Sequence, residues 1–156
     1  MASTRTSAGI LLHRRAGHSF EVLLGHPGGP LFGRRDEGVW SIPKGLVEPG
    51  EALLAVAERE FEEETGRRVP DGPRLDLGSI VQRGGKVVHA WAVEGDLDPS
   101  TARSNTFEME WPPRSGRRAT FPEIDRVAWF EPAEAARKVN PGQIPLIERL
   151  EAALGA

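Results

Sequence analysis

The stretch that decides the fold runs from Gly45 to Gly66 and reads GLVEPGEALLAVAEREFEEETG. It opens with a Pro/Gly turn and ends in a run of acidic residues. At about 100° per residue, Glu60, Glu63 and Glu64 fall on one stripe of a helix. Like charges at i and i+4 destabilise a helix, so this stripe needs a positive partner. A hard divalent cation is the natural candidate, because carboxylate oxygens suit magnesium, manganese and calcium.

The same stretch predicts a helix that begins near residue 51 and runs to about residue 65. Leu54, Ala57 and Phe61 recur at i, i+3 and i+7, which predicts a buried stripe beside the acidic one. Gly66 suits the left-handed position that ends many helices. The sequence therefore predicts both where this helix begins and where it ends.

Size and composition limit the classes of protein that fit. The chain has 156 residues, which suits one domain, and a net charge of −3, which gives no electrostatic footprint for DNA or RNA. It has no cysteine, so disulfides and thiolate chemistry are excluded. Residues 1–7 lack the apolar run of a signal peptide, and no stretch approaches the length of a membrane span. We expect a cytoplasmic domain, either monomer or homodimer, with no membrane and no stable nucleic-acid partner.

The rest of the chain predicts strands on both sides of the central helix and helices at its end. The candidate strands are residues 7–14, 20–25, 39–42, 75–82, 86–94, 105–111 and 126–130. The candidate loops are residues 26–38, 44–50 and 112–118, and the later helices are 132–139 and 143–154. No internal repeat or long linker divides the chain. This order predicts a single α/β domain with a mixed sheet, in which residues 1–5 are a flexible end and residues 6–156 form the domain.

The spacing that begins at Gly45 resembles the signature of the Nudix hydrolases, G-x5-E-x7-R-E-U-x-E-E-x-G-U, where U is a bulky apolar residue. The matching positions are Gly45, Glu51, Arg59, Glu60, Phe61, Glu63, Glu64 and Gly66. Arg67 stands where the signature has an aliphatic residue, so the departure concerns packing just after the helix. The resemblance implies an α/β/α sandwich. It also implies hydrolysis of a nucleoside diphosphate linked to another moiety, by attack of water on phosphorus.

The resemblance also implies roles for individual residues. The ligands that it implies for Mg²⁺ or Mn²⁺ are the backbone carbonyl of Gly45 and the side chains of Glu60, Glu63 and Glu64. Arg59 would orient the carboxylates through a salt bridge to Glu63 or Glu51, which places Arg59 and Glu51 in the catalytic set. The candidates for the general base are two acids of the helix and two from a later strand: Glu63, Glu64, Glu108 and Glu110.

Other charged and aromatic residues have two readings each. An acidic run usually means a solvated helix face, and that reading suits Glu58 and Glu62, which lie away from the stripe. Lys44, beside the metal loop, is either a phosphate contact or a surface lysine. Arg34 either guides a polyphosphate or belongs, with Arg35, Asp36 and Glu37, to a neutral surface loop. The densest basic patch has an aromatic neighbour and is either a substrate-facing loop or a solvated one: Arg114, Arg117, Arg118 and Trp111.

The run WSIPKGLVEPGE at residues 40–51 resembles the loop of asymmetric dinucleoside polyphosphate hydrolases. Because the chain has no tyrosine, tryptophan or phenylalanine would have to stack on a base. We expect hydrolysis of a phosphoanhydride bond in a small nucleoside polyphosphate, with dinucleoside polyphosphates as candidates. The alternatives are a MutT-type pyrophosphohydrolase for oxidised nucleoside triphosphates and a non-catalytic Nudix module that binds a nucleotide.

Overall fold

A six-stranded sheet forms the middle layer of this computed structural model, which describes residues 5–155. Its strands are β1 (Thr6–Ala16), β2 (Ser19–Pro27), β3 (Lys44–Leu46), β4 (Leu75–Val81), β5 (Val87–Glu94) and β8 (Ile124–Phe130). The order is β4-β5-β1-β2-β8, and β3 pairs with β1. Strands β1 and β5 run parallel and the other neighbours run antiparallel. The predicted mixed sheet is confirmed.

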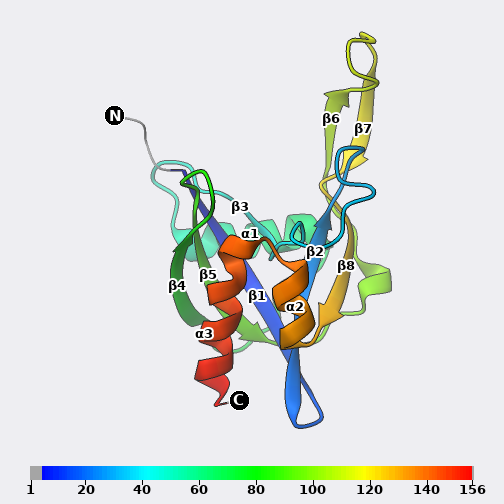
Figure 1. Cartoon of the computed structure of the whole chain (residues 1–156). Helices are drawn as coiled ribbons and strands as arrows, with labels where there is room; N and C mark the ends of the chain where they lie inside the picture. Colours follow the sequence, from blue (N-terminus) through cyan, green and yellow to red (C-terminus); the bar gives the residue numbers. More distant parts are fainter. Residues whose placement is uncertain (1–4, 156) are drawn as a thin grey trace.

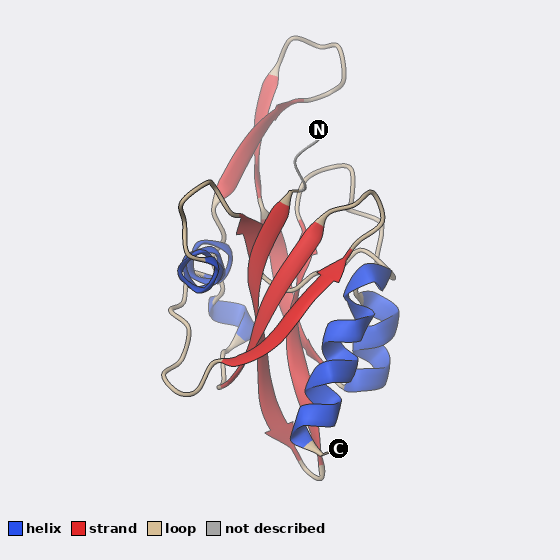
Figure 2. Cartoon of the chain, turned by 90° about the vertical axis from the view of Figure 1, so that its left-hand side faces the viewer, coloured by secondary structure: helices blue, strands red, loops and turns tan. Residues whose placement is uncertain are grey.

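Helices cover both faces of this sheet (Figure 2). The helix α1 (Leu53–Thr65) lies on one face, and α2 (Pro132–Lys138) and α3 (Ile144–Leu154) lie together on the other (Figure 1). Each face has its own apolar core: one joins α1 to β1, and the other joins α3 to β4 and β5. Two short 3-10 turns, η1 (Pro99–Thr101) and η2 (Pro141–Gln143), complete the elements. The predicted α/β/α sandwich is therefore confirmed.

The central helix begins two residues later than predicted. Its first residue is Leu53, and Glu51 lies in the turn before it. The carboxylate of Glu51 accepts a hydrogen bond from the backbone N–H of Glu48 at 2.8 Å and pairs with Arg59 at 2.6 Å. Glu51 thus fastens the turn to the second turn of the helix. The helix ends as predicted, with Gly66 in the left-handed conformation at φ 73°.

The segment before α1 differs from the prediction. Residues 39–42 form only isolated bridges, at Trp40 and Ser41, whereas residues 44–46, predicted as loop, form β3. Strand β3 runs antiparallel to the start of β1, which places Gly45 opposite Ala8. A Cβ on Gly9 would lie 2.6 Å from the carbonyl oxygen of Pro43, so a glycine there permits the close approach of β3. Three residues are too short for a periodic signal.

A two-stranded ribbon projects from the sandwich (Figure 1). It consists of β6 (Thr106–Glu110) and β7 (Arg118–Pro122), paired antiparallel with each other and with no third strand. The sequence predicted β6 but not β7, since residues 118–122 contain a single large apolar side chain, Phe121. Strand β7 is therefore the element of this ribbon, residues 106–122, that the sequence analysis missed.

Of the predicted flexible end, residues 1–4 lie outside the described residues. Arg5 is described, and its carbonyl accepts a hydrogen bond from the N–H of Val87 at 2.9 Å, which extends the pairing of β1 with β5. Among residues 5–155, no helix has both the length and the apolar character needed to cross a membrane.

Candidate active site

The acidic stripe of α1 lies over strand β3. Glu60 sits so close above Gly45 that a Cβ on this glycine would overlap its carboxylate. Glu64, one turn later, accepts a hydrogen bond from the backbone N–H of Lys44. Helix α1 is held in this position by Val56, Ala57 and Phe61, which are fully buried. One of the predicted metal-binding carboxylates, Glu60, therefore lies over the predicted glycine of β3, and a second, Glu64, lies beside the neighbouring Lys44.

Both carboxyl groups are in surroundings that disfavour their charge. Burial and the nearby Glu60 raise the pKa of Glu64 from 4.5 to about 8, although Lys44 opposes the shift. Burial and Glu63 likewise raise the pKa of Glu60, and Arg59 opposes this. Carboxylates that are crowded and half-buried gain most from a hard cation. The residues present thus fit Mg²⁺ or Mn²⁺ by both their oxygen donors and their unbalanced charge.

Glu63 lies beside Arg59. Its carboxylate lies 4.0 Å from the Arg59 guanidinium, which also approaches Glu51 at 2.6 Å and Glu60 at 3.7 Å. Within residues 5–155, no three histidine, aspartate or glutamate side chains converge as a ready-made metal cage. Arg59 is thus the cation that Glu51, Glu60 and Glu63 share. Arg59 contacts both partners that the sequence analysis proposed for it.

Lys44 lies in β3 beside the acidic pair. Burial is the main cause that lowers the pKa of its ammonium group, and the nearby Lys86 adds to this effect. Glu64 and Glu60 act in the opposite direction. The lysine therefore places a half-buried positive charge next to the two carboxylates, where a phosphate could also reach it.

Sequence reasoning missed Glu123, which lies between β7 and β8. Its charge contributes to raising the pKa of both Glu60 and Glu64, so its carboxylate lies within electrostatic reach of the acidic pair. By contrast, Glu108 and Glu110 are exposed on the ribbon, and Glu110 accepts a hydrogen bond from the backbone N–H of Arg114 at 2.9 Å. No sequence spacing could have found Glu123, since it is remote from the helix in the chain.

A backbone connection holds Glu123 beside the helix. The N–H of Asn105 donates to the carbonyl of Glu63 at 2.8 Å, and the N–H of Glu123 donates to the carbonyl of Asn105 at 2.7 Å. Just before it, the N–H of Arg103 donates to the carbonyl of Thr65. A Cβ on Gly66 would lie 2.8 Å from the Arg103 carbonyl oxygen. Gly66 therefore both ends α1 and lets this segment dock on it.

The family of the chain follows from comparison with known proteins. The family model described as the NUDIX domain matches residues 3–150. The chain belongs to the NUDIX family. The structure agrees with this, because the signature residues lie on α1 and on the β3 loop that precedes it.

Individual relatives share parts of this NUDIX domain. An octanoyltransferase of Myxococcus xanthus is 33% identical over 111 residues, which cover 70% of this chain and 28% of that protein. An RNA pyrophosphohydrolase of Rhodopseudomonas palustris is 41% identical over 84 residues, or 49% of this chain and 48% of that protein. The chain therefore spans less than half the length of either relative. The C. elegans Ap4A hydrolase, in a binary complex, superposes with a TM-score of 0.69 at 21% identity and covers 97% of this chain and 98% of that one.

A pocket of about 230 Å³ opens beside Glu64 in this NUDIX domain. It lies between the segment after η1 and strand β8, and its basic lining residues are Arg103 and Arg126. Neither arginine was a candidate from the sequence, because each stands alone and outside any basic cluster or motif. Their presence next to Glu64 makes them candidates for binding phosphate.

The remaining predicted substrate contacts lie away from the acidic pair. Arg34 is exposed in the loop between β2 and β3. Arg114 and Trp111 belong to the tip of the ribbon, where Trp111 is half-buried and Arg114 is exposed. The structure thus brings Lys44, Gly45 and the helix acids together. It places Arg34 on the loop between β2 and β3, and it places Trp111 and Arg114 on the ribbon.

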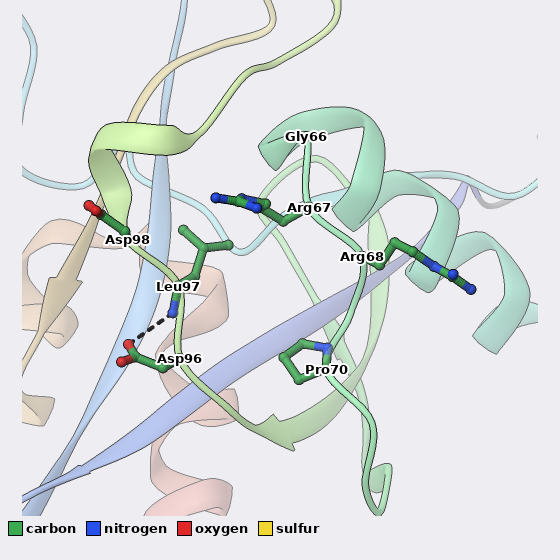
Figure 3. A pocket seen from close by; sticks show the side chains of 7 residues that line it. All are labelled: Gly66, Arg67, Arg68, Pro70, Asp96, Leu97 and Asp98. Carbon is green, nitrogen blue, oxygen red and sulfur yellow. Dashed lines mark hydrogen bonds between the residues drawn. The ribbon is translucent and has the colours of Figure 1, made fainter.

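The departure at Arg67 is accommodated at the surface of the NUDIX domain. Figure 3 shows a pocket of about 640 Å³ at the end of α1, with Arg67 pointing across it toward the segment of Asp98 while Arg68 points away. The Nε of Arg67 donates to the hydroxyl of Thr101 at 3.2 Å. Its backbone N–H donates to the buried Thr65 hydroxyl. Arg67 therefore joins α1 to η1 and does not pack beneath the loop.

Proposed function

We propose that this NUDIX-domain protein is a Mg²⁺- or Mn²⁺-dependent hydrolase of phosphoanhydride bonds in nucleoside polyphosphates. The observation that carries the proposal is the neighbouring pair Glu60 and Glu64, with Glu60 directly over Gly45 and with the pKa values of both carboxyl groups raised. A polyphosphate and an acidic pair repel each other, so they can meet only when cations lie between them. The unbalanced charge of the site therefore suits an anionic substrate that arrives with a divalent metal.

The residues that would hold the metal are those nearest the pair: the Gly45 carbonyl, Glu60, Glu64, and Glu63 after a turn of its side chain. When bound, the metal supplies charge neutralisation and polarises the phosphoryl oxygens. Glu123 is a further acid within electrostatic reach of the same place. Such a donor set is made of oxygen, as magnesium and manganese prefer.

The side chains of the chain itself have distinct tasks in this proposal. Arg59, anchored on Glu51, orients Glu60 and Glu63 through its ion pairs. Lys44 contacts a phosphate oxygen from the β3 side. Water attacks phosphorus in line with the leaving group, and a carboxylate of the helix, Glu63 or Glu64, accepts its proton.

The relatives support a pyrophosphate bond as the target. One is named an RNA pyrophosphohydrolase and the structural neighbour an Ap4A hydrolase, and both names refer to phosphoanhydride bonds. We propose a small nucleotide, with dinucleoside polyphosphates first among the candidates. A MutT-type enzyme would instead release pyrophosphate from a triphosphate, and a binding module would release nothing.

The test is a screen of the purified protein with Mg²⁺, with Mn²⁺ and with EDTA. Diadenosine tetraphosphate, nucleoside triphosphates including oxidised dGTP, and nucleotide sugars are incubated and their products separated by chromatography. We expect metal-dependent products, with a mononucleotide and a longer nucleotide from the dinucleotide. Monophosphate and pyrophosphate from oxidised dGTP alone would identify the MutT-type activity. Tight nucleotide binding with no product under any metal condition would contradict hydrolysis and favour the binding module.

A further inference from the structure

The side chain of His26 is fully buried near the end of β2, and both of its ring nitrogens have a partner. Its Nδ1 lies 2.9 and 3.1 Å from the two carboxylate oxygens of Asp125 in β8. Its Nε2 lies 2.6 Å from the backbone carbonyl oxygen of Arg35, in the loop that follows β2. One imidazole ring therefore joins β2, this loop and β8.

The two partners of His26 are both hydrogen-bond acceptors. A carbonyl oxygen can only accept, and so can an ionised carboxylate. A neutral imidazole has a single N–H, so it would leave the lone pair of its other nitrogen facing an oxygen. Both contacts are satisfied at once when the ring carries a proton on each nitrogen. The geometry thus indicates a buried imidazolium beside Asp125.

Another histidine–aspartate pair in the sheet shows the contrast. The Nε2 of His89 in β5 lies 2.7 Å from Asp76, while its Nδ1 lies 2.9 Å from the hydroxyl of Ser79. A hydroxyl can donate or accept, so a neutral His89 makes both bonds by donating to Asp76 and accepting from Ser79. The hydrogen bonds of His89 place no requirement on its charge, whereas those of His26 do.

Asp125 also lines the pocket beside Glu64, whose wall contains Arg103 and Arg126 as well. The Oδ1 of Asp125 lies 3.3 Å from the Nη1 of Arg126, so His26 and Arg126 share this oxygen. Without a second cation, Asp125 would cancel the charge of Arg126 and repel an anion in the pocket. An imidazolium on the buried side of Asp125 offsets that charge and leaves the two arginines in excess over Glu64.

Trp40 supports both His26 and Arg126. The rings of Trp40 and His26 pack edge-to-face, with 5.1 Å between their centroids. The Arg126 guanidinium lies 5.1 Å over the Trp40 ring, which is within the range of a cation–π contact. The indole N–H of Trp40 donates to Asp36 at 2.8 Å, and this bond fixes the ring. Arg126 therefore has a support other than its pairing with Asp125.

We propose that His26 is a positioning residue, held as an imidazolium, that neutralises Asp125 and so keeps Arg126 available to a phosphate group in the pocket beside Glu64. This inference rests on the proposed function for phosphate as the anion. His26 acts through Asp125 and Arg126, and its buried ring does not touch the substrate.

The first experiment determines the protons on the ring in the wild-type protein. Long-range proton–nitrogen correlation spectra at neutral pH distinguish an N–H nitrogen from one that carries a lone pair. We expect two protonated nitrogens in His26, and the loss of these signals in His26→Gln assigns them. A lone pair on either nitrogen of His26 would overturn the proposal, because Asp125 would then lack its buried cation.

The second experiment measures the binding of imidodiphosphate, a pyrophosphate analogue without an anhydride oxygen to hydrolyse, by calorimetry in Mg²⁺. His26→Gln keeps an N–H donor but removes the charge, so affinity should fall about 10- to 30-fold. That is roughly the effect of one unit charge about 8 to 12 Å away at an effective dielectric constant of about 20. His89→Gln, the matched control in the other pair, should leave affinity unchanged.

Asp125→Asn separates an effect of charge from an effect of structure. In the His26→Gln background it restores zero net charge at the two positions, so affinity should return to within about threefold of the wild type. In the wild-type background it should change affinity equally little, because the ring gives up its second proton when its anionic partner is gone. A double variant as weak as His26→Gln would overturn the proposal. So would a gain of about tenfold or more in Asp125→Asn alone.

These outcomes are distinct from failure of the proposed function. If the wild type binds imidodiphosphate but hydrolyses no nucleotide, the proposed function fails, and the affinities of the four variants still decide the role of His26. A wild type that binds no imidodiphosphate would overturn the role of His26, since the pocket would not hold a phosphate. Circular dichroism checks the fold of each variant. Should His26→Gln not fold, the spectra of the wild type and the affinity of Asp125→Asn decide.

Discussion

The acidic site and the ribbon of this protein are built in opposite ways. Glu60 and Glu64 stand on a helix that three fully buried side chains fix to the sheet. The ribbon, residues 106–122, is joined to the sandwich only at its root and carries half-buried side chains on one face. Groups that take part in chemistry need positions fixed to a fraction of an ångström. The two regions therefore differ in how firmly the fold fixes their side chains.

The largest expected difference between the regions is in stability. Phe61 is fully buried between α1 and the sheet, so Phe61→Ala should cost about 3–5 kcal/mol of unfolding free energy. Phe121→Ala, on the half-exposed ribbon, should cost about 1 kcal/mol or less. Urea unfolding of the two variants beside the wild type measures both values. Comparable losses would mean that the ribbon belongs to the cooperative core, and the contrast would be wrong.

The next largest effect is expected on activity, when a residue of the acidic stripe of α1 is changed. Glu64→Gln removes a charge that the proposed metal needs, so kcat should fall roughly 100- to 1,000-fold, the scale for one group that stabilises the transition state. Glu62→Gln is the matched control, because Glu62 is exposed on the same helix away from the acidic pair. Initial rates in saturating Mg²⁺ give the comparison. Equal rates for the two variants would remove Glu64 from the site.

A smaller effect is expected when the glycine of β3 gains a side chain. The added Cβ of Gly45→Ala would overlap the Glu60 carboxylate, which is the flexible end of a side chain and can move aside. We therefore expect unfolding free energy to change little. The displaced carboxylate should lower kcat by up to about 100-fold, as misplacement by an ångström can. Thermal unfolding and initial rates on one preparation separate the two effects. A large loss of stability with an unchanged rate per folded molecule would contradict this account.

The same contrast explains what the sequence could predict. The site could be predicted because its residues are close in the sequence. Gly45, Glu51, Arg59 and the helix acids lie within one continuous stretch, so the helical period indicates which of them share a face. The apolar periods of β1, β2, β4 and β5 similarly predicted most of the sheet. The start of α1 shifted because Glu51 bonds back to its own turn, which competes with extending the helix.

What the sequence could not predict depends on contacts between distant segments. Glu123 reaches the site through Asn105 and the end of α1, and no spacing reports such a connection. Arg103 and Arg126 approach Glu64 from two different segments. Strand β7 is set by pairing with β6 more than by its own composition. The strand predicted at 39–42 was wrong because its neighbours give it only single bridges.

The last prediction concerns pH, and it tests the site without any substrate. The pKa of Glu64 is raised to about 8 in the folded protein, against an ordinary value of 4.5, chiefly by burial. Between these values the folded protein therefore holds a proton that the unfolded chain has lost. The contribution of this group to unfolding free energy should fall as pH rises from about 4.5 to about 8, and then level off.

Glu64→Gln removes this contribution, so the metal-free variant should become progressively more stable than the wild type over that range. Urea unfolding in EDTA at pH 5, 6, 7 and 8 measures the difference, and Glu62→Gln serves again as the control. Saturating Mg²⁺ should reverse the order at pH 8, because a ligand that binds only the folded state stabilises it. Parallel pH curves for wild type and Glu64→Gln would mean that Glu64 ionises as freely in the folded protein as in the unfolded chain. The crowding that leads us to place a cation at this site would then be absent.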